Sequence, residues 1–307
     1  MNLPVFTVSQ PSEQKINYQN LKEGFVRAFD MFSDQISKGK NLLISRPILS
    51  KPDSNTKLAK TTDRTLGYKL YSLFLAPALS SGYNTCPWSS KECVALCLNT
   101  SGRGAMASVQ IARIKKTKFM VEHPESFMCN MLSEMLSAMR SAENKSNKLA
   151  IRLNGTSDIA WEYSAPFIEY FCNGGSNSGV SYLDNLPKFQ LYDYTKSPAR
   201  VLKKPNWYDM TLSFSGHNWS ECKNILDSMS GRVAMVFSDG IPDNYMGYRV
   251  VNGDNDDFRF MDDLGVIVGL NYKKTGNKNE SMVKLDKWDD GISQLKFIVR
   301  HKEHFLG

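Results

Sequence analysis

The segment LAIRLNGTSDIAWE, residues 149–162, is the clearest indication of the fold class. It opens with a short strand, Leu149–Leu153, that is apolar except for Arg152. Polar residues and a glycine follow, and a helical stretch begins at Trp161. A strand that is apolar throughout, rather than at every second residue, is typical of a parallel sheet covered on both faces. The segment therefore predicts one β/α unit.

Similar units recur along the chain. Further strands are predicted at Leu66–Leu79 (with an end at Pro77), Phe189–Tyr192, Asp209–Phe214, Arg232–Phe237, Tyr248–Val251 and Val266–Leu270. Helical stretches are predicted at Leu21–Ile36, from about Ala105 to Ala142 with a break near Pro124, and at Trp161–Phe171, Ser197–Leu202 and Trp219–Met229. This alternation predicts an α/β fold with a mostly parallel sheet, and six or seven strands favour a (β/α) barrel-like or partial-barrel arrangement slightly over an open doubly wound sheet. We expect an irregular or helical N-terminal extension at 1–65 and the α/β barrel-like domain at 66–307.

The composition is that of a soluble globular protein. The 307 residues are 41% hydrophobic and 22% charged, which excludes disordered, collagen-like and coiled-coil classes. No apolar run approaches the ~18–20 residues of a membrane helix, and the N-terminus lacks the features of a secretory signal. We therefore expect a cytoplasmic protein without a membrane partner.

The net charge of +7 is concentrated in the first half of the chain. Residues 1–150 hold 20 Lys and Arg against 11 Asp and Glu, whereas residues 151–307 hold 18 against 20. A basic half permits an anionic partner, either nucleic acid or a small phosphorylated molecule, without requiring one.

Polar clusters follow strand after strand, at 154–158, 193–196, 213–218 and 238–239. The carboxyl ends of parallel strands converge on one site, although turns also favour such residues. Arg152 favours the site interpretation, because a buried arginine needs an anionic partner or a polar cavity. The residues expected to line the site are Arg152, Asn154, Asp158, Asp193, Lys196, Ser213 and His217.

Catalytic and ligand-binding roles can be assigned within this set. We expect catalysis from Asp158, Glu162, Lys196 and His217, with Asp158 or Glu162 as the acid or base and Lys196 or Arg152 clamping an anion. Ligand binding is further expected from Gly102, Arg103 and Gly104, because backbone N–H groups at a helix start bind anions. The alternative for these three residues is a plain helix-entry loop.

Three of the six cysteines, Cys86, Cys93 and Cys97, lie within 12 residues of sequence. In a cytosolic protein, clustered cysteines favour metal binding or redox chemistry over disulfides. Cys93 and Cys97 are four residues apart, so a helix there would present both sulfurs on one face, and Cys86 could supply a third thiolate. The scattered cysteines at 129, 172 and 222 are most simply small buried hydrophobic residues.

The identity of the metal stays open at this point. An iron–sulfur cluster held by three cysteines needs no fourth protein ligand. Zinc normally takes four ligands and would have to recruit His217 or Cys129 from a distance. The third alternative is that no metal binds. The Cys-x3-Cys-x2-Cys spacing usual for radical S-adenosylmethionine enzymes is absent.

Two further segments are rich in charged residues, one basic and one acidic. Arg113, Lys115, Lys116 and Lys118 are expected on a solvated basic side of a helix, with a nucleic-acid footprint as the alternative. The segment Gly253–Asp257 is interpreted as an acidic turn in which Asp254 or Asp257 could pair with Arg152 or Arg249.

Several of these segments together resemble the bacteriophage "gene product 88" family. The similar runs are SGYNTCPWSSKECVALCLNTSGRGA, RLNGTSDIAWE, YDYTK, LSFSGHN and VNGDNDDFRFMDDLGVIVGL, between about residues 66 and 272. The resemblance implies phage or prophage origin and location in the host cytoplasm, and it implies no reaction. The order of strand, cysteine-rich loop and (β/α) units also resembles radical S-adenosylmethionine barrels in architecture.

These observations lead to two hypotheses. The first is an iron–sulfur enzyme that acts on an anionic small molecule or nucleotide, with S-adenosylmethionine-dependent radical chemistry as one form of it. The second is a zinc-stabilised nucleic-acid-binding or phage accessory protein without catalytic activity, in which Tyr83, Trp88 and Trp161 could stack on bases.

Overall fold

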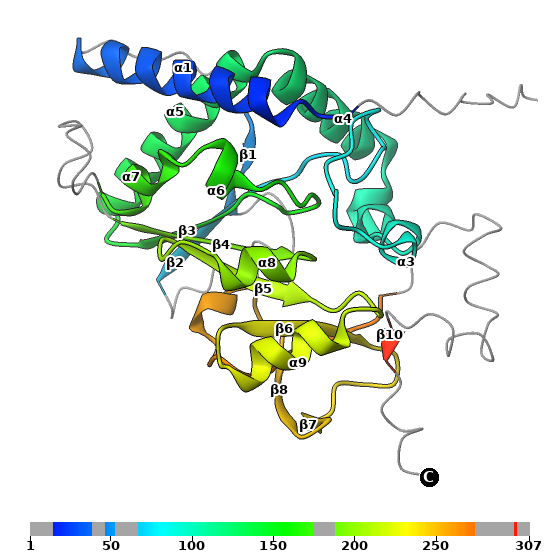
Figure 1. The fold of residues 1–307 in the computed structure, drawn as a ribbon. Coiled ribbons are helices and arrows are strands. Elements are labelled where there is room, and N and C mark those ends of the chain that lie inside the picture. The colour runs from blue at the N-terminus through cyan, green and yellow to red at the C-terminus, as the bar shows by residue number, and fades with distance from the viewer. Residues whose placement is uncertain (1–14, 39–46, 53–66, 175–187, 274–297, 300–307) are drawn as a thin grey trace, which may run out of the picture.

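The computed structural model describes residues 15–38, 47–52, 67–174, 188–273 and 298–299. Its strands form one mixed sheet that is mostly parallel (Figure 1). The strands are β1 (Leu49–Ser50), β2 (Tyr68–Leu73), β3 (Lys148–Arg152), β4 (Phe189–Thr195), β5 (Tyr208–Ser213), β6 (Arg232–Phe237), β7 (Asn244–Tyr245), β8 (Tyr248–Asn252), β9 (Ile267–Asn271) and β10 (Ile298–Val299). All seven predicted strands are present, and the largest difference is in β2, which ends at Leu73 and not at Pro77. The short β1, which lies within the expected N-terminal extension, pairs antiparallel with β2.

The strands do not form the expected barrel. Among the described residues the strand order is β1-β2-β3-β4-β5-β6-β9-β8-β7, with β10 beside β6, and the two edges do not meet. A barrel of this kind needs strands that follow one another in order around the circle. Here β9 lies between β6 and β8, so the consecutive order ends at β6, and the antiparallel pair β7–β8 forms the edge. The sheet is open.

Helices connect the parallel strands and cover one face of the sheet. They are α1 (Tyr18–Ser37), α3 (Lys91–Ala95), α4 (Ala107–Glu122), α5 (Pro124–Glu143), α6 (Trp161–Ser164), α7 (Ile168–Cys172), α8 (Pro198–Leu202) and α9 (Trp219–Asp227), with 3-10 turns η2 (Leu98–Thr100), η3 (Gly102–Ala105) and η5 (Arg259–Met261). The predicted break at Pro124 is confirmed. A second proline, Pro166, lies where the single helix expected at 161–171 divides into α6 and α7, because proline disrupts a helix interior.

Alternate residues of the strands face two different layers. Ile151, Leu191 and Met210 point into the main core with the helices. On the opposite face, Ala150 and Tyr192 pack with Phe258 from the β8–β9 connection. The sheet is therefore covered by helices on one side and by this connection on the other.

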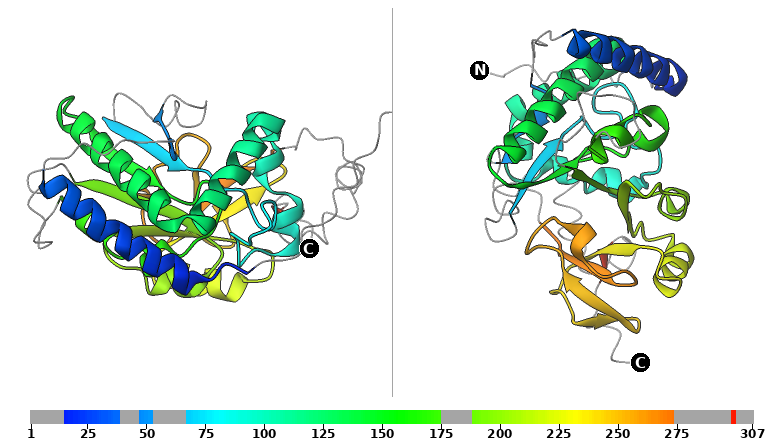
Figure 2. Two further views of the ribbon diagram at one scale, coloured as in Figure 1. Left: turned by 90° about the horizontal axis from the view of Figure 1, so that it is seen from above. Right: turned by 90° about the vertical axis from the view of Figure 1, so that its left-hand side faces the viewer.

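The helix α1 belongs to the main core. It lies along α5 (Figure 2), and a side chain at Gly24 would meet Pro124 at 2.7 Å, so the two helices touch closely there. Phe25 is fully buried and stacks on Trp161 with ring centroids 5.9 Å apart. None of the helices in the described part of the chain combines the length and apolar character needed to cross a bilayer.

Candidate functional site

A pocket of about 200 Å3 lies at the carboxyl ends of β3, β4 and β5, beneath the cysteine-bearing segment. Eight of the predicted site residues line it: Cys86, Cys93, Cys97, Arg152, Asn154, Asp158, Lys196 and Ser213. The structure thus brings the cysteines and the strand-end polar residues together, as the convergence of parallel strands predicts. Thr156, Ser157, Tyr194 and Thr195 also line it.

Hydrogen bonds join the cysteine-bearing segment to the residues that follow β2 and to the turn that follows β3. The Thr85 hydroxyl donates to the Ala76 carbonyl at 2.6 Å, and the Asp158 N–H donates to the Thr85 carbonyl at 2.8 Å. The Cys86 sulfur accepts the Ala78 N–H at 3.3 Å. Burial raises the pKa of the Cys86 thiol to about 12, so without a metal or cation this thiol stays protonated at neutral pH.

The other two cysteines are not presented by one helix, which corrects the sequence expectation. The helix α3 holds Cys93 but ends at Ala95, and Cys97 follows in extended backbone as the residue before η2. Burial raises the pKa of both thiols, and the nearby Lys196 opposes this for Cys93. Both side chains still reach the same pocket.

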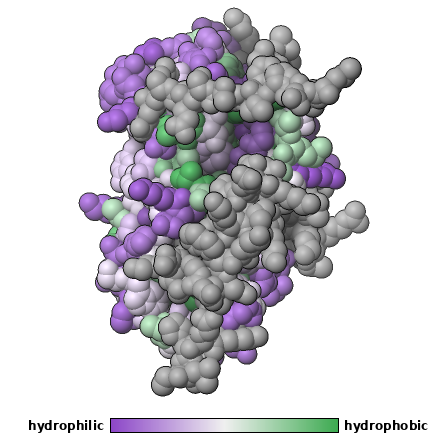
Figure 3. All heavy atoms as spheres, turned by 90° about the vertical axis from the view of Figure 1, so that its right-hand side faces the viewer, coloured by the Kyte–Doolittle hydropathy of each residue, from purple (hydrophilic) through white to green (hydrophobic). Residues whose placement is uncertain are grey.

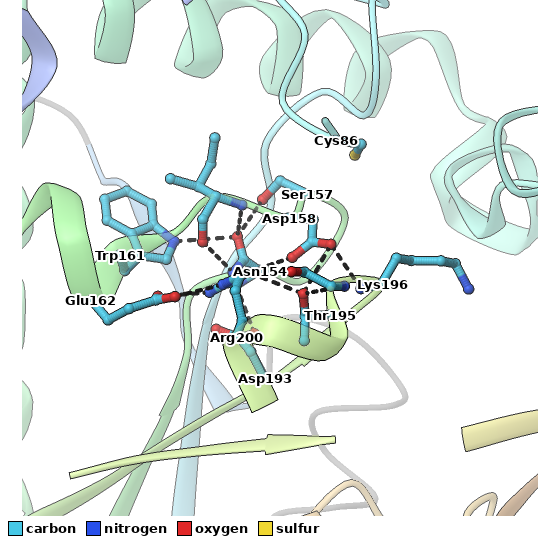
Figure 4. A network of polar contacts seen from close by, with 12 residues as sticks. Cys86, Asn154, Ser157, Asp158, Trp161, Glu162, Asp193, Thr195, Lys196 and Arg200 are labelled. Carbon is cyan, nitrogen blue, oxygen red and sulfur yellow. Dashed lines mark hydrogen bonds and ion pairs between the residues drawn. The ribbon is translucent and has the colours of Figure 1, made fainter. Parts of the chain in front are cut away.

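A buried ion-pair network supports the pocket from the side of α8 (Figure 4). Arg200, which is 3% exposed, donates to Asp158 Oδ1 at 2.5 Å and binds both carboxylate oxygens of Glu162 at 2.6 and 2.8 Å. Asp158 Oδ2 accepts the backbone N–H of Lys196 at 2.9 Å and the Thr195 hydroxyl at 3.2 Å. All oxygens of both carboxylates are therefore engaged, and Glu162 lies outside the pocket lining.

Asn154 and Asp193 fix the turn after β3. The Asn154 side-chain oxygen accepts from Ser157, the Ile159 N–H and the Trp161 indole at 2.9–3.2 Å. Asp193 is 1% exposed and accepts the Leu153 and Asn154 N–H groups and the Tyr208 hydroxyl. Burial raises the pKa of Asp193 to about 7, and Arg152 and these donors oppose the rise. Asp193 thus holds the turn and does not line the pocket.

Arg152 reaches the opposite face of the sheet and confirms a predicted pairing. Its Nη1 donates to Asp257 Oδ2 at 2.7 Å, and the Tyr192 hydroxyl donates to the same oxygen at 3.2 Å. The guanidinium lies over the Tyr194 ring, 4.6 Å from its centroid. Asp254 instead accepts from Asn271 and pairs with Lys273.

Four other predicted residues lie away from the pocket. Gly102, Arg103 and Gly104 form η3, and a side chain at Gly104 would clash with the Asn99 carbonyl at 2.7 Å, which gives this glycine a packing role. His217 has a 55% exposed side chain and lies 3.8 Å from Glu92.

The predicted basic side of α4 is also interrupted. Arg113 donates to the Asn99 side chain and lies over Phe74, and the Lys116 ammonium donates to the Ile48 carbonyl at 2.5 Å. Of the four cations, Lys115 and Lys118 lie on the exposed side of the helix. Apolar side chains interrupt the hydrophilic surface on the face that carries α3 and α4 (Figure 3).

Two residues with a part in the site were missed. Arg200 lies in α8, a short and weakly patterned helix, and nothing in its neighbourhood marks it as buried. Tyr194 belongs to a predicted polar cluster, but the sequence does not show which members of that cluster face the pocket. That depends on the register of β4, in which Tyr194 pairs with Thr211 of β5.

The fold and the site define an open-sheet α/β protein with a cysteine-lined pocket at the carboxyl end of its parallel strands. The chain belongs to the gene product 88 family, whose family model matches residues 46–285. The match confirms the resemblance to this bacteriophage family, and it includes every residue of the pocket. The chain matches no curated protein and no solved structure.

Proposed function

We propose that the pocket is the active site of an iron–sulfur enzyme, in which Cys86, Cys93 and Cys97 hold the cluster and an anionic small molecule or nucleotide binds beside it. One observation carries the proposal. The three clustered cysteines line the same pocket as Arg152, Lys196 and other polar residues from three separate strand ends. Strand ends of this kind are where α/β proteins place their ligands.

The cysteines fit such a group by their chemistry, and all three line the same pocket. Thiolates are the usual ligands of iron–sulfur clusters, and three of them leave one iron open to a substrate or cofactor. Among the described residues, no three His, Cys, Asp or Glu side chains are already arranged to hold a single metal ion. Binding of a cluster is therefore expected to include a rearrangement of the segment that carries Cys93 and Cys97, whose helix α3 has no buried residue.

The surroundings favour an open site over a closed zinc site. A structural zinc needs four protein ligands. Asp158 lines the pocket, but both of its oxygens accept hydrogen bonds. His217 lies outside the pocket lining, and Cys129 is on α5, where its thiol donates to the Ala28 carbonyl at 3.6 Å. Within the described residues the pocket therefore offers three thiols and no obvious fourth ligand.

The charged residues of the pocket have separate roles in this proposal. Lys196 and Arg152 are the cations that face a ligand, and Lys196 is also held by its bond to the Phe214 carbonyl at 3.0 Å. Asp158 is the candidate to exchange a proton with a ligand, because it lines the pocket and Glu162 does not. Such an exchange requires that a ligand displace one of the hydrogen bonds that Asp158 accepts.

The test is the visible spectrum of protein purified without oxygen and supplied with iron and sulfide. We expect a broad absorption in the wild type that is absent from the Cys86/Cys93/Cys97→Ala triple variant. The matched control is Cys129→Ala, which removes a thiol outside the pocket and should keep the absorption. A folded wild type that takes up no iron, or a triple variant that takes up as much as the wild type, would overturn the proposal.

A further inference from the structure

We propose that the ligand of this pocket carries a carboxylate or phosphate group and that this group binds to Arg152, Tyr194 and Ser213, here called the oxyanion wall. The inference rests on the proposed function, since it assigns one end of the ligand in the same pocket. The three residues lie at the ends of the adjacent strands β3, β4 and β5, and all three line the pocket with the cysteines.

Two donors of the oxyanion wall are buried without a hydrogen-bond partner among the described residues. They are Arg152 Nε and the Tyr194 hydroxyl. Arg152 Nε forms an ion pair with Asp193 Oδ1 at 3.7 Å, which is too long for a hydrogen bond. A buried polar group left unpaired costs ~1–3 kcal/mol. A ligand that accepts hydrogen bonds at this wall would remove that cost.

The position of Arg152 is fixed before any ligand arrives. One nitrogen, Nη1, is bound by Asp257, and the guanidinium plane rests on the Tyr194 ring. Asp257 also accepts from the Tyr192 hydroxyl, so the arginine is not its sole source of stabilisation. A donor set held in place in this way loses little conformational entropy when it binds.

The charge and the chemistry of the pocket both favour an acceptor-rich anion. Of the charged residues that line it, Arg152 and Lys196 are cations and Asp158 is the single carboxylate, and both Asp158 and Arg152 have a partner outside the lining, Arg200 and Asp257. A guanidinium has donors only, and the hydroxyls of Tyr194 and Ser213 can donate. Carboxylate and phosphate oxygens match such a set, because hydrogen bonds to charged acceptors are the strong ones.

The test measures the stabilisation of the full-length protein by inorganic phosphate and by acetate, at constant ionic strength set with chloride. We expect at least one of the two to bind the wild type, and which one binds identifies the group. Tyr194→Phe should weaken binding about tenfold, the size expected for one hydrogen bond to a charged acceptor. It should leave the stability of the free protein unchanged or higher, because the Tyr194 hydroxyl has no hydrogen-bond partner within the part of the chain that the structure describes. Ser213→Ala should also weaken binding, whereas Tyr163→Phe, an exposed tyrosine on α6, should not.

The proposal is overturned if neither probe binds the wild type, or if Tyr194→Phe and Ser213→Ala bind as tightly as the wild type. The cysteine triple variant separates this outcome from failure of the cluster proposal. Retention of anion binding in that variant supports the oxyanion wall whether or not a cluster forms. If the protein forms a cluster but binds neither probe, only the proposal about the oxyanion wall is overturned.

Discussion

At the scale of single residues, the polar side chains after the strands divide into two groups. Some line the pocket with groups that a ligand can reach, as Arg152, Lys196 and Ser213 do. Others, above all Asn154 and Asp193, use their polar atoms to hold the turn after β3. From the sequence these groups look alike, because asparagine, aspartate and serine serve both purposes. Only the hydrogen-bond partners separate them.

Replacement of Asn154 tests the supporting role. We expect Asn154→Ala to lower the free energy of unfolding by ~3 kcal/mol, because it leaves the Ile159 N–H and the Trp161 indole N–H without their acceptor. Denaturant unfolding measures the change, with the exposed Asn206→Ala as a control near zero. A loss below ~1 kcal/mol for Asn154→Ala would contradict the role.

Asp193 gives a prediction about pH. Its pKa of about 7 in the folded protein exceeds the ~3.9 of an unfolded aspartate, so between these values the folded state holds a proton that the unfolded state has released. The contribution of this group is therefore complete below about pH 4 and is lost as the pH rises through 7. We expect the stability of the wild type, compared with Asp193→Asn, to fall between pH 4 and pH 8.

Unfolding curves of the two proteins at several pH values measure this difference. Comparison with Asp193→Asn removes the contribution of other buried carboxyls. A difference that stays constant, or that grows as the pH rises, would show that Arg152 and the donors to Asp193 outweigh its burial.

At the scale of elements, the cysteine segment is held over the pocket from two sides. On one side the Thr85 carbonyl accepts the N–H of Asp158, in the turn after β3. On the other side the Trp88 ring lies against the guanidinium of Arg200 in α8, with 5.3 Å between the guanidinium carbon and the ring centroid. The second contact joins the cysteine segment to the buried network of Arg200, Asp158 and Glu162. Within this network Asp158 lines the pocket, whereas Arg200 and Glu162 support it from outside the lining.

Removal of the Trp88 ring should loosen the segment without unfolding the protein. We expect Trp88→Ala to raise the rate at which a water-soluble thiol reagent modifies the pocket cysteines by about two- to fivefold, which corresponds to the ~0.5–1 kcal/mol of a partly exposed cation–π contact. Trp88→Phe keeps a ring over Arg200 and should react nearly as the wild type does. Equal rates in all three proteins would mean that this contact does not hold the segment.

The elements themselves were largely predictable. Strands such as Arg232–Phe237 are compact apolar runs, and the break at Pro124 follows from the chemistry of proline. The end of α3 before Cys97 was missed, because the i, i+4 spacing of Cys93 and Cys97 permits a helix without requiring one. The contribution of α8 was missed because its key contact, between Arg200 and Glu162, joins residues 38 positions apart.

At the scale of the whole molecule, the sequence predicted a mostly parallel α/β sheet and the convergence of its strand ends. It did not predict that the sheet is open. The placement of β9 between β6 and β8 depends on pairing between distant strands, which local patterns of hydrophobicity do not encode.

The packing of α1 gives a prediction at this scale. Phe25 is fully buried between Trp161 and Phe127, so we expect Phe25→Ala to cost about 3–5 kcal/mol of stability. The matched control is Val26→Ala, a more exposed neighbour on the same helix.

We also expect a chain that lacks residues 1–38 to lose cooperative unfolding. A shortened chain that unfolds at the same denaturant concentration as the full protein would show that α1 is dispensable for the core.

The metal and sulfide content of the protein purified without oxygen shows directly whether the pocket cysteines hold an iron–sulfur cluster. We expect iron and acid-labile sulfide in nearly equal amounts, about four of each per chain for a cubane cluster. Both should be lost in the Cys86/Cys93/Cys97→Ala variant and kept in Cys129→Ala. One zinc per chain, or a folded protein that contains neither iron nor sulfide, would contradict the iron–sulfur proposal.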